Sequence, residues 1–161
     1  AGLHEKFQEV GACYVQVVPV DNPLAPIARE DMIEAHEAGA ELAVYAIIKV
    51  TGESVGRLVA EQDLRVIEYT EERADQTGAP GYTGLFSMTL ACFERCADQE
   101  LSWHEAVKVW QGQNVIKREK FVFDAFHGIA SFKVLTCDRQ KVFAPIKEAQ
   151  DVYKYANLIH N

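Results

Sequence analysis

The chain has 161 residues, of which 48% are hydrophobic and 25% charged, a balance typical of a globular domain that buries a core. Its formal net charge of −8, from 24 acidic and 16 basic residues, disfavours binding to nucleic acid or to an anionic membrane surface. The sequence contains no apolar run of the roughly 18 residues that a membrane-spanning helix needs. We therefore expect one domain, residues 1–161, that binds neither nucleic acid nor membrane.

The first part of the chain predicts a strand, a helix and a second strand. Residues 12–19 are rich in β-branched side chains and end at a proline, a pattern typical of a strand. A helix begins near Pro26 and stops at Gly39. Residues 41–50 are continuously apolar, so periodicity alone fits a strand or a helix, but their β-branched content favours a buried strand.

The middle of the chain predicts two helices on either side of a strand and a glycine-rich loop. A short helix over residues 54–62 leads to a strand over residues 63–72. Residues 74–84 contain three glycines and a proline and predict a loop. The helix that follows, over residues 85–99, is apolar around much of its circumference, so we expect it at the centre of the domain.

The last third predicts a helix, a hairpin and a final helix. Ser102 begins a capping box that opens the first of these helices. Two strand-like runs, residues 119–126 and 129–137, are separated by His127-Gly128, which suits a two-residue hairpin turn. An amphipathic stripe over residues 146–159 predicts the last helix.

These elements together predict an α+β (mixed) fold, with an α/β fold as the alternative. We expect a single layer-packed domain with a mixed sheet, a C-terminal β-hairpin and about five helices. No internal repeat, low-complexity tract or linker divides the chain.

The four cysteines, Cys13, Cys92, Cys96 and Cys137, are sparse for a disulfide-stabilised fold. We expect free thiols in a reducing, cytoplasmic compartment. Cys92 and Cys96 are spaced to share one helix face, as a metal-binding pair would, but no second pair with zinc-like spacing accompanies them. The sequence therefore predicts no metal site and favours two buried apolar thiols.

Ser54 lies in Gly52-Glu53-Ser54-Val55-Gly56, which fits the nucleophile elbow G-x-S-x-G after a predicted strand. The pentapeptide resembles the elbow of carboxylesterase-type α/β-hydrolases, which implies Ser54 as nucleophile, with His127 after an acid such as Asp98 or Asp124. That fold needs several strands before its elbow, and only about 50 residues precede this one. A tight turn in which Ser54 caps the next helix explains the same residues.

A second candidate site is the stretch GAPGYTG at residues 78–84, immediately before the predicted helix at 85. Glycine-exposed amides and a helix N-terminus together favour an anion such as phosphate or carboxylate. The expected ligand-binding residues are Gly81, Tyr82, Thr83 and Gly84. A flexible connection is the common alternative for such a stretch, and no cofactor can be assigned from it.

Two histidines are weaker candidates for catalysis. His127 is expected in a turn near Asp124, and His104 in the exposed first turn of a capped helix. Neither belongs to a metal-binding motif such as H-E-x-x-H.

Three functional hypotheses follow. The first is an enzyme or ligand-binding domain for a small, possibly anionic molecule. The second is a non-enzymatic, self-associating subunit, a homo-oligomer that uses residues 121–137 or the C-terminal helix as its interface. The third is a serine hydrolase that uses Ser54.

Overall fold

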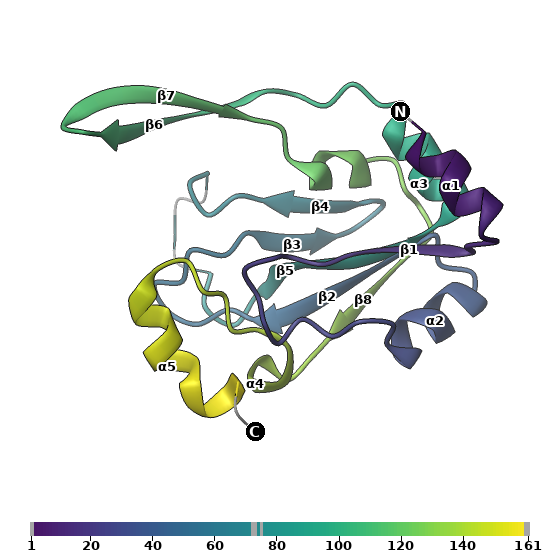
Figure 1. Cartoon of the computed structure of the whole chain (residues 1–161), viewed down its shortest axis with the longest axis horizontal. Helices are drawn as coiled ribbons and strands as arrows, with labels where there is room; N and C mark the ends of the chain where they lie inside the picture. The colour runs from purple at the N-terminus through teal and green to yellow at the C-terminus, as the bar shows by residue number, and fades with distance from the viewer. Residues whose placement is uncertain (1, 72–73, 75, 160–161) are drawn as a thin grey trace.

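A six-stranded mixed sheet forms the centre of the computed structural model, which describes residues 2–71, 74 and 76–159 (Figure 1). The strand order is β4-β3-β5-β2-β8, and β1 also pairs with β5. β8 runs parallel to β2, whereas the other pairs in this sheet are antiparallel. These strands are β1 (Tyr14–Val17), β2 (Leu42–Ile48), β3 (Arg57–Ala60), β4 (Leu64–Ile67), β5 (Pro80–Thr89) and β8 (Phe132–Thr136).

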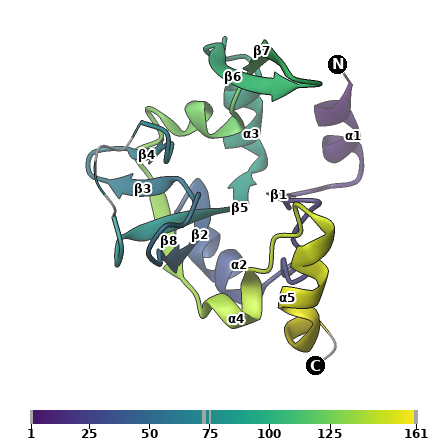
Figure 2. The ribbon, with the colours of Figure 1, turned by 90° about the vertical axis from the view of Figure 1, so that its left-hand side faces the viewer.

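Helices cover both faces of the sheet, with α3 on one side and α2 and α4 on the other (Figure 2). Two further strands, β6 (His104–Trp110) and β7 (Gln113–Glu119), form a separate hairpin. The arrangement confirms the predicted mixed α+β class. Among the described residues, no helix combines the length and apolar character that crossing a membrane requires. The helices are α1 (Leu3–Glu9), α2 (Glu30–Glu37), α3 (Leu90–Ala97), the 3-10 helix η1 (Val122–Phe126), α4 (Arg139–Val142) and α5 (Ala149–Ile159).

β2 is the central strand of the core and is buried on both faces, which explains its continuously apolar sequence. Successive side chains of a strand point to opposite faces. Leu42 and Val44 accordingly pack with the cluster beneath α3 and η1, whereas Ala43 and Tyr45 pack with α2. The strand predicted over residues 41–50 is therefore confirmed.

The helix predicted over residues 54–62 is wrong, because β3 occupies the middle of that segment. Val55, Leu58 and Val59 have helical spacing, but Leu58 is buried and its neighbours are not, as expected for a strand. Pairing with β4, from Leu58 to Val66, outweighs the local helical pattern.

The helix predicted over residues 85–99 is only half right. Its first five residues belong to β5, and α3 begins after Thr89, whose hydroxyl accepts a hydrogen bond from the amide of Cys92. The loop predicted up to residue 84 likewise ends early, since Pro80 is already in the strand. The anion site proposed at residues 81–84 therefore loses the helix N-terminus on which it rested.

The two C-terminal elements after α3 also differ from prediction. Residues 104–110 form a strand instead of a capped helix, and the true hairpin turn is Gln111-Gly112, where both residues have positive φ. No hairpin joins residues 119–126 to 129–137. The first run forms η1, and the second forms β8, which pairs with β2 instead.

Gly84 shows why a glycine is needed within β5. Its φ is +80°, and a Cβ there would lie 2.8 Å from Cγ of Pro19, a ring that cannot move aside easily. We expect Gly84→Ala to lower the free energy of unfolding by about 2 kcal/mol or more, from backbone strain plus the clash. Gly39→Ala is the matched control, because Gly39 has φ +97° but open space around its Cβ position.

Urea denaturation of both variants separates the two causes. The loss in Gly39→Ala measures backbone strain alone, and the excess in Gly84→Ala measures contact with Pro19. Equal losses in the two variants would contradict the close approach.

Candidate functional site

Two cavities form the candidate site. The first, about 220 Å³, lies between the segment after β4 and the base of the β6–β7 hairpin. We call it the acidic–aromatic pocket. Its lining residues include Glu68, Tyr69, Glu71, His104, Glu119 and Phe121.

Glu68 is the carboxylate whose electrostatic setting is most unusual in this pocket. Partial burial, followed by the negative charges of Glu71 and Glu119, raises the pKa of Glu68, and the positive charges of His104 and Lys147 only partly offset this. A hydrogen-bond donor, such as a ligand hydroxyl, stabilises a carboxylate in that environment.

This setting predicts that Glu68 reduces stability. The pKa of Glu68 is higher in the folded protein than in the unfolded chain. The stability that its protonated form contributes is therefore lost as the pH rises from the ordinary carboxyl pKa through the raised pKa of Glu68. We expect Glu68→Gln to raise the free energy of unfolding at pH 7 by at most about 1 kcal/mol, since the group is partly exposed.

Thermal or urea unfolding of Glu68→Gln between pH 4 and pH 8 measures the effect. The difference from the unmodified chain should be present at pH 7 and vanish near pH 4. A variant that is less stable at pH 7 would show that the carboxylate is well paired.

The hydroxyl group of Tyr82 lies buried near Glu68 and has no hydrogen-bond partner among the described residues. Burial, followed by the charge of Glu68, raises the pKa of Tyr82. Its ring packs edge-on against Phe123 and Phe126, with centroid distances of 5.6 and 6.0 Å. An unpaired buried hydroxyl costs about 1–3 kcal/mol.

An aromatic wall lines the other side of the pocket. Phe121 stacks on Phe123 with centroids 4.8 Å apart, and the ring of His104 lies 4.5 Å from that of Phe121. His104 Nε2 is 2.7 Å from Oδ2 of Asp124, which orients the imidazole. Rigid aromatic faces beside carboxylates provide both apolar and hydrogen-bonding contact for a ligand that carries hydroxyl groups.

The second cavity, about 490 Å³, lies between the loop after β2 and the segment from α4 to α5. We call it the basic pocket. It is lined by three cationic side chains, Arg139, Lys147 and Lys154, and by the carboxylates of Glu53 and Asp151. Arg139 bonds Glu53 at 2.6 Å, whereas the Lys147 ammonium group makes no hydrogen bond or ion pair within the described part of the chain. Lys147 therefore offers a charge for an anionic group.

The position of Lys147 depends on a buried clamp at Asn22. The side-chain amide of Asn22 donates to the carbonyl of Val142 at 2.7 Å and accepts from the amide of Ala144 at 2.9 Å. One residue earlier, the carbonyl of Asp21 accepts from the amide of Ile146 at 2.7 Å. These three bonds fix the segment that presents Lys147 to the basic pocket.

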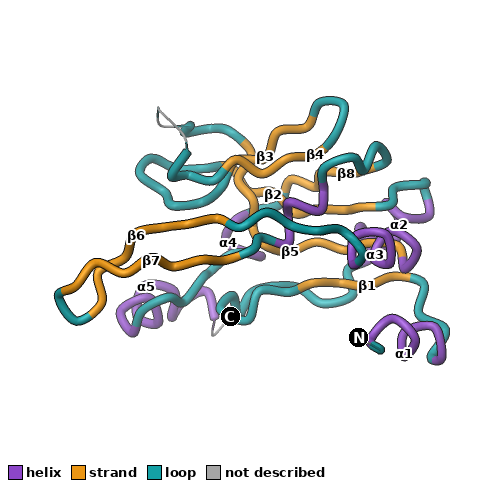
Figure 3. The backbone as a smooth tube through the Cα atoms, turned by 90° about the horizontal axis from the view of Figure 1, so that it is seen from above, coloured by secondary structure: helices purple, strands orange, loops and turns teal. Residues whose placement is uncertain are grey.

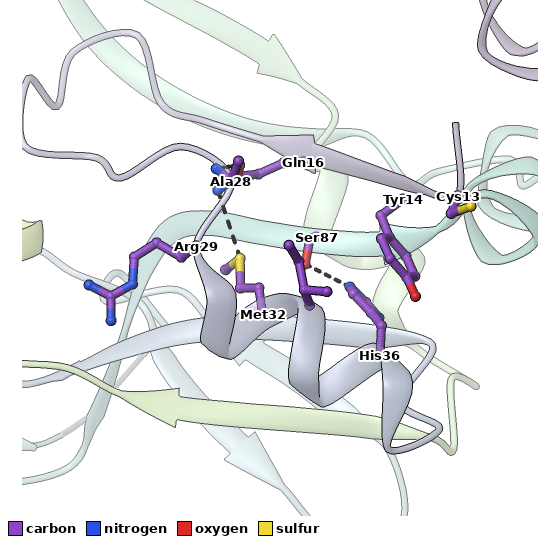
Figure 4. Close-up of a pocket in the computed structure, with 9 residues that line it drawn as sticks. Cys13, Tyr14, Gln16, Ala28, Arg29, Met32, His36 and Ser87 are labelled. Atoms are coloured by element: carbon purple, nitrogen blue, oxygen red, sulfur yellow. Dashed lines mark hydrogen bonds between the residues drawn. The ribbon is translucent and has the colours of Figure 1, made fainter. Parts of the chain in front are cut away.

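A third cavity, about 270 Å³, lies between β1 and α2 (Figure 4). His36 and Ser87 meet in it, with His36 Nε2 2.8 Å from the Ser87 hydroxyl oxygen and Nδ1 2.7 Å from the carbonyl of Ala40. Both side chains are buried and their polar atoms are satisfied by one another and by the backbone. This cavity therefore presents less unsatisfied polar chemistry than the two pockets above.

Ser54 lines the basic pocket, but no histidine is among the residues that surround it there. Its loop leads into β3 instead of the helix that a nucleophile elbow requires. His127, its expected base, lies 3.1 Å from Asp63 in an exposed position and does not pair with Asp124, which binds His104. The hydrolase hypothesis is unsupported.

The predicted ligand residues of β5 fall on opposite faces of the sheet. Tyr82 packs with the cluster beneath η1, whereas the hydroxyl of Thr83 donates to the carbonyl of Tyr45 on the other face. Gly81 and Gly84 allow close packing against Lys49 and Pro19. Tyr82 and His104 are thus the sequence candidates that lie in or beside the acidic–aromatic pocket.

Sequence reasoning missed Glu68 and Lys147, because neither belongs to a recognisable motif. The available signal was their position after apolar runs, "RVIE" and "FAPIK", where a lone charge marks the end of a buried segment. Within the described residues, no group of three or more histidine, cysteine, aspartate or glutamate side chains is arranged to hold a metal ion. The four cysteines are free, and burial raises the pKa of Cys92 to about 12.

Comparison with known proteins points to one class of enzyme. The chain is 31% identical to a probable UDP-N-acetylglucosamine pyrophosphorylase of Caenorhabditis elegans, in an alignment that covers 91% of this chain and 36% of the relative. It is 26% identical to a protein described in the same words from Encephalitozoon cuniculi, over 85% of this chain and 44% of that protein. No family model matches the sequence.

Comparison with solved structures points to the same class of enzyme. The crystal structure of the UDP-N-acetylglucosamine pyrophosphorylase of Trypanosoma brucei, in complex with an inhibitor, superposes with a TM-score of 0.82 and 28% identity. The match covers 97% of this chain and 36% of that one. The chain thus spans less than half the length of the proteins it resembles.

Proposed function

We propose that this chain forms the sugar-nucleotide-binding part of a UDP-sugar pyrophosphorylase that acts in the cytoplasm. The observation that supports it best is the similarity to the Trypanosoma brucei enzyme over 97% of the chain. The ligand would be a small anionic nucleotide sugar, in keeping with the small, possibly anionic molecule expected from the sequence.

The two pockets suit the two chemical parts of such a ligand. In the acidic–aromatic pocket, Glu68 accepts a hydrogen bond from a sugar hydroxyl, and the ring of Phe121, backed by the buried ring of Phe123, forms an apolar wall. In the basic pocket, Lys147 neutralises part of the diphosphate charge. Because the chain carries a net charge of −8, this local cation is needed to hold an anionic ligand.

UDP-N-acetylglucosamine is the specific substrate that we favour, since both curated relatives carry that name. A pyrophosphorylase cleaves the diphosphate of the nucleotide sugar with pyrophosphate, giving a sugar 1-phosphate and a nucleoside triphosphate. Lys147 would then stabilise the charge on the phosphate oxygens as the bond between the two phosphates is exchanged.

Calorimetric titration of the 161-residue chain with UDP-N-acetylglucosamine tests the proposal. We expect saturable binding of one ligand per chain, weaker binding of UDP-glucose, and no binding of a neutral disaccharide of similar size. Absence of heat with both UDP-sugars at millimolar concentration would contradict the proposed function.

A further inference from the structure

The β6–β7 hairpin lies apart from the main sheet (Figure 3). Within the described residues, each of its strands pairs only with the other. A two-stranded hairpin without further packing is at best marginally stable in water. Its base nevertheless forms one wall of the acidic–aromatic pocket, through His104, Glu105, Ala106, Lys108 and Glu119. The shape of that pocket therefore depends on what holds the base of the hairpin in place.

The side chain of His104 attaches the hairpin to η1. Its Nε2–H donates to Oδ2 of Asp124 at 2.7 Å, since a carboxylate can only accept. Both side chains are mostly buried, with exposed fractions of 29% and 25%. Among the described residues, no other hydrogen bond or ion pair joins residues 104–119 to the rest of the domain. The position of the hairpin base thus depends on this one contact and on the rings around it.

The segment that receives His104 is itself well supported. Phe123 anchors η1 in the core, and the amide of Asp124 donates to the carbonyl of Phe121 at 3.1 Å. That turn brings the ring of Phe121 to the same imidazole, with the centroids of Phe121 and His104 4.5 Å apart. Phe121 in turn stacks on Phe123 at 4.8 Å. Packed rings thus lead from the core to the base of the hairpin.

The carboxyl group of Glu68 lies within electrostatic reach of the same hairpin base. After burial and the charge of Glu71, the pKa of Glu68 is raised by the charge of Glu119 and lowered by that of His104. His104 and Glu119 are paired with one another at the base of the hairpin. A displaced hairpin would therefore change the surroundings of the carboxylate that we assign to the sugar.

We propose that His104 is a positioning residue of the acidic–aromatic pocket, which holds the hairpin base and the Phe121 ring where they contact the sugar. This role rests on the proposed function, in which the pocket binds the sugar of a nucleotide sugar. His104 acts through Asp124 and Phe121 and needs no contact with the ligand. Because a preorganised wall avoids the cost of ordering it on binding, loss of the attachment weakens binding of the sugar and spares UDP.

Hydrogen exchange tests the attachment without any ligand. Amides of residues 104–119 should exchange at least about tenfold faster in His104→Ala and in Asp124→Ala than in the unmodified chain. The double variant should exchange no faster than His104→Ala, because both substitutions break the same bond. Asp124→Asn keeps an acceptor for His104 and should retain slow exchange. Unchanged exchange in the two alanine variants would overturn the attachment.

His127→Ala is the matched control for both measurements. His127 also pairs with an aspartate, Asp63, at 3.1 Å, but its side chain is 75% exposed and lines neither pocket. Its replacement should leave hairpin exchange and ligand binding unchanged. An effect as large as that of His104→Ala would show that loss of any histidine–aspartate pair loosens the domain, and would overturn the assignment to His104.

Calorimetry tests the link between the attachment and binding. His104→Ala should weaken the binding of UDP-N-acetylglucosamine about 3- to 10-fold and leave that of UDP unchanged. His104→Gln keeps a donor for Asp124 and should recover part of the lost affinity. Faster hairpin exchange with unchanged affinity for UDP-N-acetylglucosamine, or an equal loss for both ligands, would overturn the positioning role. If the unmodified chain binds neither ligand, the proposed function fails and the positioning role with it, whereas hydrogen exchange still decides whether His104 holds the hairpin.

Discussion

Asn22→Ala is expected to lower the free energy of unfolding by about 3 kcal/mol and to remove sugar-nucleotide binding. The substitution deletes both bonds of the clamp and leaves the Val142 carbonyl and the Ala144 amide unpaired in the core. Each such orphaned group costs about 1–3 kcal/mol. Since Ala144 is fully buried, water cannot replace the lost partner.

Urea denaturation measures this loss, and Asn114→Ala is the control. Asn114 is an exposed asparagine in the hairpin, so its replacement should change stability by no more than about 0.5 kcal/mol. Asn22→Asp separates the two bonds of the clamp, because it keeps the acceptor for Ala144 and loses the donor to Val142. A fully stable Asn22→Ala variant would show that the segment before α5 is held by other contacts.

Lys147→Met is expected to weaken the binding of UDP-N-acetylglucosamine about 10- to 100-fold while leaving stability nearly unchanged. A charged hydrogen bond contributes about 1.5–3 kcal/mol, which corresponds to that range. Among the described residues, the Lys147 ammonium group makes no direct ion pair and interacts only electrostatically with Glu68 and Asp151, so the fold loses little when it is replaced.

Calorimetry of Lys147→Met beside Lys133→Met tests this assignment. Lys133 is an exposed lysine on β8 and lines neither pocket, so its replacement makes the same change in net charge away from the site. If both variants bind with equally reduced affinity, the ligand is attracted by the overall field of the protein and not by Lys147.

Local sequence signals predicted the elements whose pattern agrees with their long-range pairing. Residues 14–17 and 42–48 are β-branched and apolar and form strands, and the amphipathic stripe of α5 forms a helix. The helix predictions for residues 85–89 and 104–110 were wrong, because the apolar side chains there recur at intervals that fit a helix as well as a strand. Pairing of Phe86 with Val44 decides between the two, and that contact joins residues far apart in the chain.

The site was harder to predict than the fold for the same reason. Tyr82 and His104 were selected from the sequence as residues of a loop and a helix, yet they lie on strands. Glu68 and Lys147 are 79 positions apart in the chain, and their electrostatic interaction arises only when the clamp at Asn22 fixes the segment before α5. No single stretch of sequence contains that juxtaposition.

We propose that the acidic–aromatic pocket binds the sugar and that the basic pocket binds the diphosphate. The most direct test is to titrate Glu68→Gln with UDP-N-acetylglucosamine and with UDP, which lacks the sugar. We predict that the variant loses affinity for the nucleotide sugar and binds UDP as the unmodified chain does. Equal loss for both ligands, or no loss for either, would contradict the account.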